Sequence, residues 1–255
     1  MPLEIITIPC LADNYAYLVH DAISGHTAVV DVPDAAPISA ALIERNWTLS
    51  EVWLTHHHWD HIDGLPALLA QHPAKVVGAK ADAHRLPDLD HAVCDGDTFM
   101  FGGEPVHILD VSGHTVGHIA LHLPETGALF TADSLMALGC GRLFEGTPAQ
   151  MHESLQKTET MAGETLVYSG HEYTASNAAF AATIDPQNMH LISRIKDIAS
   201  KRANAQPTVP SSLQLERETN PFLRAHDPLI QANLNMVGAA PVDVFTEIRA
   251  RKDRF

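Results

Sequence analysis

The stretch Thr55-His56-His57-His58-Trp59-Asp60-His61, which follows the apolar run Val52-Trp53-Leu54, decides the fold. Side chains alternate between the two sides of an extended segment, so alternate members of this stretch should converge, with one more joining from the next turn. The converging side chains are those of His56, His58, Asp60 and His61. They offer more lone pairs than one tetrahedral zinc with an open position needs, so the stretch predicts two adjacent metal ions rather than a histidine-rich surface loop.

The composition is that of an acidic globular protein. The 255 residues are 45% hydrophobic and carry a formal net charge of -15, which disfavours a nucleic-acid partner because phosphate backbones repel acidic proteins. No apolar run reaches the length of a membrane span, and Met1 to Cys10 lacks the features of a signal peptide. We expect a cytoplasmic monomer without a membrane partner, and reduced thiols at Cys10, Cys94 and Cys140.

Hydrophobic periodicity separates a part with strands and helices from a purely helical part. Strands are predicted over 3–8, 15–20, 27–32, 52–55, 76–77, 106–111, 119–123, 129–132 and 166–169. Helices are predicted over 35–46, 64–71 and 148–161, the last with Thr147 as its N-cap, and 81–96 is expected to be mostly loop and short helix. From about Ala175 strand-like runs disappear, and helices are predicted around 191–199, 227–237 and 242–252. We therefore expect one domain over 1–174 and a helical domain over 175–255.

Three further residues of metal-ligand type follow predicted strands. His114, Asp133 and His171 each come after one of them, and loops at the same edge of a sheet would bring the three together. A carboxylate can bridge two metals, which suits Asp133 to a central position. A single histidine after a strand usually lies in the core or faces solvent. The three residues are therefore candidate metal ligands only because the chain also contains the stretch 55–61.

The stretch 55–61 resembles the Thr-His-x-His-x-Asp-His signature of the metallo-β-lactamase superfamily. Within that superfamily the chain most resembles glyoxalase II, the hydroxyacylglutathione hydrolases, over nearly its whole length. The similar segments are Asp13-Asn14-Tyr15, Gly113 to His118, Gly139 to Thr147, Gly170 to Thr174, Asn220 to Arg224 and Arg249 to Phe255. The resemblance implies an α+β fold, an αββα sandwich of two mixed sheets flanked by helices, followed by a C-terminal helical domain.

The resemblance also implies which residues hold the metals. His56, His58 and His114 would bind the first metal, Asp60, His61 and His171 the second, and Asp133 would bridge them. Asp60 and Asp133 are then the expected catalytic carboxylates, Asp60 also by orienting the attacking hydroxide. Outside both ligand sets are His57, His118 and Glu172; His118 is expected in the core or behind the ligands, and His57 on the opposite side of the extended segment.

For a glutathione moiety the resemblance implies contacts by Arg142, Phe144, Tyr173, Arg249 and Lys252. Many family members have Lys and Tyr where this chain has Arg142 and Phe144, so a cation is kept and a phenolic hydrogen bond is lost. Arg249 and Lys252 are three residues apart and therefore share one face of a helix, where they can bind the glycyl carboxylate. The plainer alternative is that these cations only complement the dipole of the last helical turn.

The activity implied is hydrolysis of the thioester S-D-lactoylglutathione, and of related S-2-hydroxyacylglutathiones, to D-lactate and glutathione in methylglyoxal detoxification. A hydroxide bridging two divalent metal ions would attack the carbonyl; we expect zinc, with iron or manganese as alternatives. A glutathione persulfide dioxygenase and a lactonase of the same superfamily are the competing functions. A β-lactamase is disfavoured by the C-terminal cations, a tRNA-processing nuclease by the charge, and a purely structural metal site by the vacant coordination positions.

Overall fold

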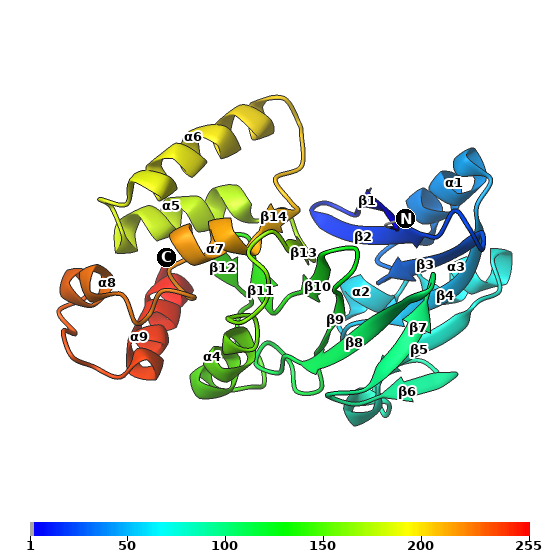
Figure 1. Cartoon of the computed structure of the whole chain (residues 1–255), viewed down its shortest axis with the longest axis horizontal. Coiled ribbons are helices and arrows are strands. Elements are labelled where there is room, and N and C mark those ends of the chain that lie inside the picture. The colour runs from blue at the N-terminus through cyan, green and yellow to red at the C-terminus, as the bar shows by residue number, and fades with distance from the viewer. Residues whose placement is uncertain (1–2) are drawn as a thin grey trace. The chain divides into compact units, whose positions relative to one another are not determined.

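The computed structural model describes residues 3–255, which form two compact units (Figure 1). Unit 1 comprises the chain up to Asp110 together with Val116–Phe130, and unit 2 comprises Val111–Thr115 together with Thr131–Phe255. The first two residues of the expected domain 1–174 lie outside the described residues. Because the chain passes between the units after residues 110, 115 and 130, each unit combines segments that are separate in sequence.

The first sheet of unit 1 is mixed. Its strands lie side by side in chain order, antiparallel from β1 to β3 and parallel from β3 to β6. The strands predicted in this region are confirmed with shifted ends, and β6 lies in the stretch expected to be mostly loop. Their bounds are β1 (Glu4–Cys10), β2 (Asn14–His20), β3 (His26–Val30), β4 (Thr48–Leu54), β5 (Lys75–Ala79) and β6 (His91–Val93).

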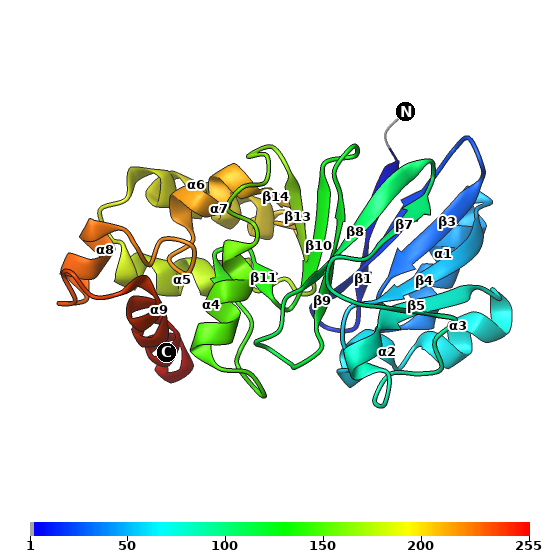
Figure 2. The same cartoon turned by 60° about the horizontal axis from the view of Figure 1, so that its bottom comes forward.

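Two helices cover one face of this sheet, α1 (Ala35–Arg45) and α3 (Leu65–Gln71) (Figure 2). Ile38 and Leu42 of α1 and Leu68 of α3 are fully buried in one apolar cluster with side chains of the strands. Burying each such side chain contributes roughly 1.5–3 kcal/mol, so the cluster holds β4 firmly at the point where the histidine stretch begins. The short α2 (Trp59–Ile62) and the 3-10 turn η1 (Lys80–Asp82) complete the helical segments described in unit 1.

A second sheet packs against the other side, and its strands within unit 1 pair in an antiparallel manner. It contains β7 (Thr98–Phe101), β8 (Glu104–Asp110), β9 (Ile119–Leu123) and β10 (Ala128–Ala132). The fully buried Trp53 of β4 meets Phe99 and Phe101 of β7 edge-on, with ring centroids 5.6 and 5.0 Å away. Tyr17 of β2 contacts Phe130 of β10 at a centroid distance of 5.6 Å. These aromatic contacts make unit 1 a sandwich of two sheets.

Strand β7 has no counterpart among the predicted strands. It is only 4 residues long, and Met100 within it is 62% exposed, so the apolar alternation is weak. The strand is joined to β8 by Gly102 and Gly103, whose φ angles are 57° and 84°. Two successive positive φ values are typical of a tight hairpin turn that glycine adopts without strain. The Gly-Gly pair was therefore the feature of the sequence from which the hairpin of β7 and β8 could have been predicted.

Unit 2 is mainly helical and contains short strands. The helix predicted over 148–161 begins at Pro148 as expected but ends earlier, at Gln156, and the predicted N-cap Thr147 forms a capping box with Gln150. Helix α7 lies in a stretch for which no element was predicted. The bounds are β11 (Leu135–Met136), β12 (Gly139–Cys140), α4 (Pro148–Gln156), β13 (Leu166–Ser169), α5 (Thr174–Ile184), α6 (Met189–Ala203), β14 (Ser211–Ser212), α7 (Leu213–Thr219), α8 (Pro228–Asn233) and α9 (Pro241–Arg254).

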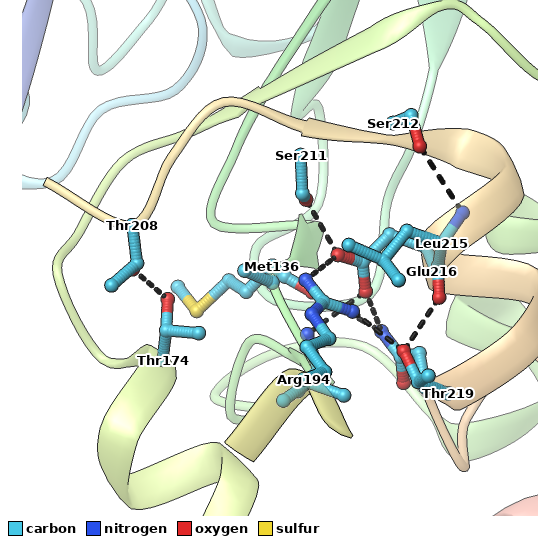
Figure 3. Close-up of polar contacts among 12 residues, drawn as sticks. Met136, Thr174, Arg194, Thr208, Ser211, Ser212, Leu215, Glu216 and Thr219 are labelled. Carbon is cyan, nitrogen blue, oxygen red and sulfur yellow. Dashed lines mark hydrogen bonds and ion pairs between the residues drawn. The ribbon is translucent and has the colours of Figure 1, made fainter. Parts of the chain in front are cut away.

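A buried carboxylate, Glu216 of α7, organises the interior of unit 2 (Figure 3). Its Oε1 pairs with Arg194 of α6 and accepts a hydrogen bond from Ser211, while its Oε2 accepts the backbone N–H of Leu138 at 2.9 Å. Asn220 donates to the same carboxylate and to the carbonyl oxygens of Met136 and Gly139. These bonds hold the β11–β12 turn, where Leu138 adopts a positive φ of 58°.

None of the helices in the described part of the chain combines the length and the apolar character that a membrane crossing needs.

Candidate metal centre

The histidine stretch begins where β4 ends, and its backbone is anchored to unit 1. The N–H of Thr55 donates to Asp31 Oδ1 at 2.9 Å, and the Thr55 hydroxyl donates to Oδ2 at 2.8 Å. The ring of His56 then lies 4.8 Å from that of His58 and 4.3 Å from that of His61. Asn14 donates to both the carbonyl and Oδ2 of Asp60, at 3.0 and 3.2 Å.

Asp31 is a functional candidate that the sequence analysis missed. Its Oδ2 lies 2.7 Å from His61 Nδ1, so this nitrogen carries the proton and Nε2 carries the lone pair that a metal needs. Asp31, His56 and His61 also form a group whose potential ligand atoms all lie within 4.8 Å of one another. The short bond to His61 favours a role in orienting the imidazole. The available signal was a carboxylate directly after a buried strand.

Two neighbouring histidines have other surroundings. His57 Nδ1 lies 2.9 Å from the buried carboxylate of Asp82, which also binds Arg85. His118 is fully buried and stacks on His56 at a centroid distance of 4.5 Å, with its Nδ1 3.1 Å from the Ile119 carbonyl. His57 is thus directed to Asp82, and His118 packs behind His56.

Unit 2 contains a second group of metal-type donors. The Nε2 atoms of His114 and His171 lie 3.4 and 3.3 Å from the same oxygen, Oδ2 of Asp133. All three side chains are buried. Two imidazole nitrogens and a carboxylate that converge in this way are suited to a divalent metal ion.

The geometry around His114 fixes its tautomer. Its Nδ1 lies 2.7 Å from the carbonyl oxygen of Arg142, which can only accept, so Nδ1 donates and Nε2 keeps the lone pair. The chain can approach this closely because residue 141 is glycine: a Cβ there would lie 1.9 Å from the Asp133 carbonyl oxygen and 3.0 Å from His114 Nδ1. The donor set and its hydrogen bonds therefore fit the metal site that the resemblance implies.

Three of the expected substrate contacts surround these histidines. Tyr173 is 40% exposed and stacks on His171, with centroids 4.6 Å apart and planes at 7°. Phe144 is 61% exposed and its ring lies 5.3 Å from that of His114. The guanidinium of Arg142 lies over the Phe144 ring at 5.6 Å. An exposed aromatic and cationic surface therefore adjoins the donors of unit 2.

The two C-terminal cations differ from each other. Arg249 is buried and donates to the Cys140 carbonyl at 3.0 Å and to Asp253 at 2.8 Å, so much of its hydrogen-bonding capacity serves the fold. The ammonium of Lys252 faces the rings of Phe180 and Phe255, at 5.2 and 5.3 Å. Burial lowers the pKa of Lys252, with the Arg249 charge as a further cause, whereas burial raises the pKa of the Cys140 thiol to about 11.

Comparisons with known proteins agree with this description. The family model "Metallo-beta-lactamase superfamily" matches residues 13–171, and "Hydroxyacylglutathione hydrolase C-terminus" matches 172–255. A hydroxyacylglutathione hydrolase of Ruegeria pomeroyi is 64% identical over 255 residues, which is 100% of both chains. The chain belongs to the metallo-β-lactamase superfamily and, within it, to the hydroxyacylglutathione hydrolases.

Solved structures support the same fold. The B3 metallo-beta-lactamase BLEG-1 is similar with a TM-score of 0.67 and 19% identity, covering 86% of this chain and 99% of that one. ETHE1 from Myxococcus xanthus has a TM-score of 0.66 and 24% identity, covering 99% of this chain and 98% of that one. The expected fold, two mixed sheets flanked by helices and followed by a C-terminal helical domain, is confirmed.

Proposed function

We propose that the protein is a metal-dependent thioester hydrolase that converts S-D-lactoylglutathione, and related S-2-hydroxyacylglutathiones, to D-lactate and glutathione. The observation that carries the proposal is the convergence of His114 and His171 on one oxygen of Asp133, with exposed Tyr173 and Phe144 beside them. The relatives named hydroxyacylglutathione hydrolase, identical at 64% of positions, support the substrate class. These relatives favour hydrolysis of a glutathione thioester over the dioxygenase and lactonase alternatives.

We further propose that the chain binds two divalent metal ions, of which zinc is the first candidate and iron or manganese the alternatives. When bound, such a pair lowers the pKa of a water molecule and polarises a carbonyl group. One set of ligands would be His56, His58 and His114, the other Asp60, His61 and His171, and Asp133 would belong to both. Metal analysis of the purified protein, with thioester hydrolysis measured on the same sample, tests this assignment.

The residues of the chain have distinct tasks in this reaction. Asn14 holds the Asp60 carboxylate, so Asp60 can orient the attacking water as well as bind metal. Asp31 and the Arg142 carbonyl keep His61 and His114 in the tautomers that present Nε2. The leaving group is a thiolate, whose conjugate acid has a pKa of about 8.5, so no separate general acid is required.

All the proposed ligands come from one chain, which supports a monomer as the active form. The buried free thiols of Cys10 and Cys140 and the exposed free thiol of Cys94 support a reducing compartment, and we propose the cytoplasm. Size-exclusion chromatography of the metal-loaded protein tests the first point.

Glutathione thioesters are expected to be cleaved far better than coenzyme A thioesters of the same acids. The proposed contacts are with the glutathione moiety, so they are lost when the thiol carrier changes, whereas different short 2-hydroxyacyl groups on glutathione should be tolerated. The measurement is kcat/KM for lactoyl and glycoloyl thioesters of both carriers. Equal rates for the two carriers would contradict glutathione recognition while leaving thioester hydrolysis intact.

Lys252→Ala is expected to raise KM by roughly tenfold to a hundredfold with a smaller change in kcat, as when a charge-assisted contact remote from the reacting carbonyl is lost. Arg249→Ala should raise KM and also lower the melting temperature, because the Cys140 carbonyl loses its donor and Phe222 loses the guanidinium 5.4 Å above it.

A matched control lies on the same helix. Arg251 forms an i,i+4 pair with Glu247 and is partly exposed, so Arg251→Ala removes the same charge with little expected effect on KM or melting temperature. An unchanged KM in both Lys252→Ala and Arg249→Ala would remove these two residues from the proposed glutathione contacts.

A further inference from the structure

A pocket lies within unit 2, and none of the proposed catalytic or glutathione-binding residues lines it. It has a volume of about 360 Å³ and is bounded by α4, the start of α9 and the segment around Phe222. Pockets that bind small molecules are typically about 300–1,000 Å³, mostly apolar, with a few placed polar groups. This pocket has that character: Leu155, Phe222 and Pro241 form apolar walls, and Arg217, His152 and His226 provide polar groups.

The guanidinium of Arg217 is fixed in place but incompletely satisfied. Its Nη2 donates to the carbonyl oxygens of Thr158 and Met161, at 2.6 and 2.7 Å. Its Nε is buried and has no hydrogen-bond partner among residues 3–255. A buried donor left without an acceptor costs about 1–3 kcal/mol, so such a group calls for a water, an ion or a ligand.

The charge around Arg217 favours an anion. The chain has 31 Asp and Glu residues against 16 Lys and Arg, yet no carboxylate within the described residues forms an ion pair with Arg217. The acidic side chain in the lining, Glu159, is exposed at the rim. His152 is half-buried, and burial, followed by the nearby His226, lowers its pKa, so it serves as a neutral hydrogen-bonding group. Arg217 is therefore the fixed positive charge of the pocket.

We propose that this pocket is a binding site for a small organic carboxylate with an apolar body, whose carboxylate pairs with Arg217 while its body packs against Phe222 and Leu155. The inference stands independently of the proposed hydrolase activity.

Two walls of the pocket connect it to the rest of unit 2. Phe222 contacts the pocket and lies under the Arg249 guanidinium, at 5.4 Å. His152 lines the pocket and follows Met151 in the chain. Met151 lies close to Gly113, the residue before His114, because a Cβ added at Gly113 would be only 2.7 Å from the Cβ of Met151. A bound carboxylate therefore contacts elements that also border the donors of unit 2, and its occupancy should alter KM rather than abolish turnover.

Benzoate is a suitable probe, and isothermal titration calorimetry on the metal-loaded protein is the direct test. We expect saturable binding of one benzoate per chain, no binding of the neutral analogue benzamide, and weaker binding of D-lactate, which has the carboxylate but a polar body. Arg217→Gln should raise the Kd for benzoate by about tenfold or more, as expected for a lost charge-assisted bond.

His226→Glu is an independent variant, because residue 226 is exposed and the substitution does not require the core to adapt. The added negative charge at the rim should raise the Kd for benzoate at least about threefold by repulsion. The control is His26→Glu, which makes the same charge change at an exposed residue outside the lining and should leave the Kd unchanged.

The proposal fails if benzoate does not bind saturably. It also fails if neither pocket variant changes the Kd, which would locate the carboxylate at the metal centre or elsewhere. Tighter binding of D-lactate than of benzoate would contradict the apolar class of ligand. None of these results bears on thioester hydrolysis by the unliganded protein.

Discussion

Asp133→Ala is expected to lose both metal ions and to lower kcat/KM by several orders of magnitude. The Nε2 atoms of His114 and His171 both lie within 3.4 Å of Asp133 Oδ2, so one oxygen serves two imidazoles. Without the carboxylate, two bound cations would lose a shared ligand and the negative charge that reduces their mutual repulsion. The measurements are metal content by elemental analysis and kcat/KM for lactoylglutathione on the same preparation.

A matched control is Asp82→Asn. Asp82 is also a fully buried carboxylate that binds a histidine, here His57, but it lies outside the proposed ligand sets. This variant should be less stable and still hold two metals per chain. If Asp133→Ala instead kept two metals and near-normal activity, the assignment of Asp133 to a shared position would be wrong.

Glu216→Ala is expected to lower the free energy of unfolding by about 3–5 kcal/mol, the typical cost when one partner of a buried ion pair is removed. Arg194 is only 5% exposed and would keep an unpaired charge. The N–H of Leu138 would also lose its acceptor. Urea denaturation of the metal-loaded protein at neutral pH measures the change.

The comparison variant is Glu247→Ala, which removes one carboxylate from the partly exposed pair with Arg251. Exposed pairs contribute about 0–1 kcal/mol, so this variant should unfold close to the wild type. Equal effects of the two substitutions would show that burial of Glu216 does not determine its contribution.

The sequence predicted most of unit 1 because the relevant signals there are local. The alternation in 15–20 and 27–32 and the turns between them were sufficient for the hairpins that became β1 to β3. The histidine stretch likewise has its own periodicity, which brings His56, His58 and His61 together after β4. Positions after predicted strands also indicated His114, Asp133 and His171, although a single residue after a strand is a weak signal, and the family resemblance then implied how the ligands divide between two metals.

The features that sequence reasoning missed depend on distant partners. Asp31 acquires its role only from Thr55 and His61, which lie 24 and 30 positions later. Glu216 acts on Leu138 across 78 positions, and no local pattern distinguishes it from a surface glutamate. The burial of Arg249 also depends on a remote group, the carbonyl of Cys140. The type of a residue shows which interactions its side chain can form, but tertiary contacts determine which of those interactions it forms in the folded protein.

The dependence of the β11–β12 turn on Glu216 and Asn220 limits how the gene can be shortened. A truncated protein ending at residue 174 would contain all seven proposed ligands, and it would seem a complete minimal catalyst. It would nevertheless lack the acceptor for the Leu138 N–H and the amide that binds the carbonyls of Met136 and Gly139. The segment after 174 is thus an internal scaffold for residues encoded before it, and neither part is an interchangeable module.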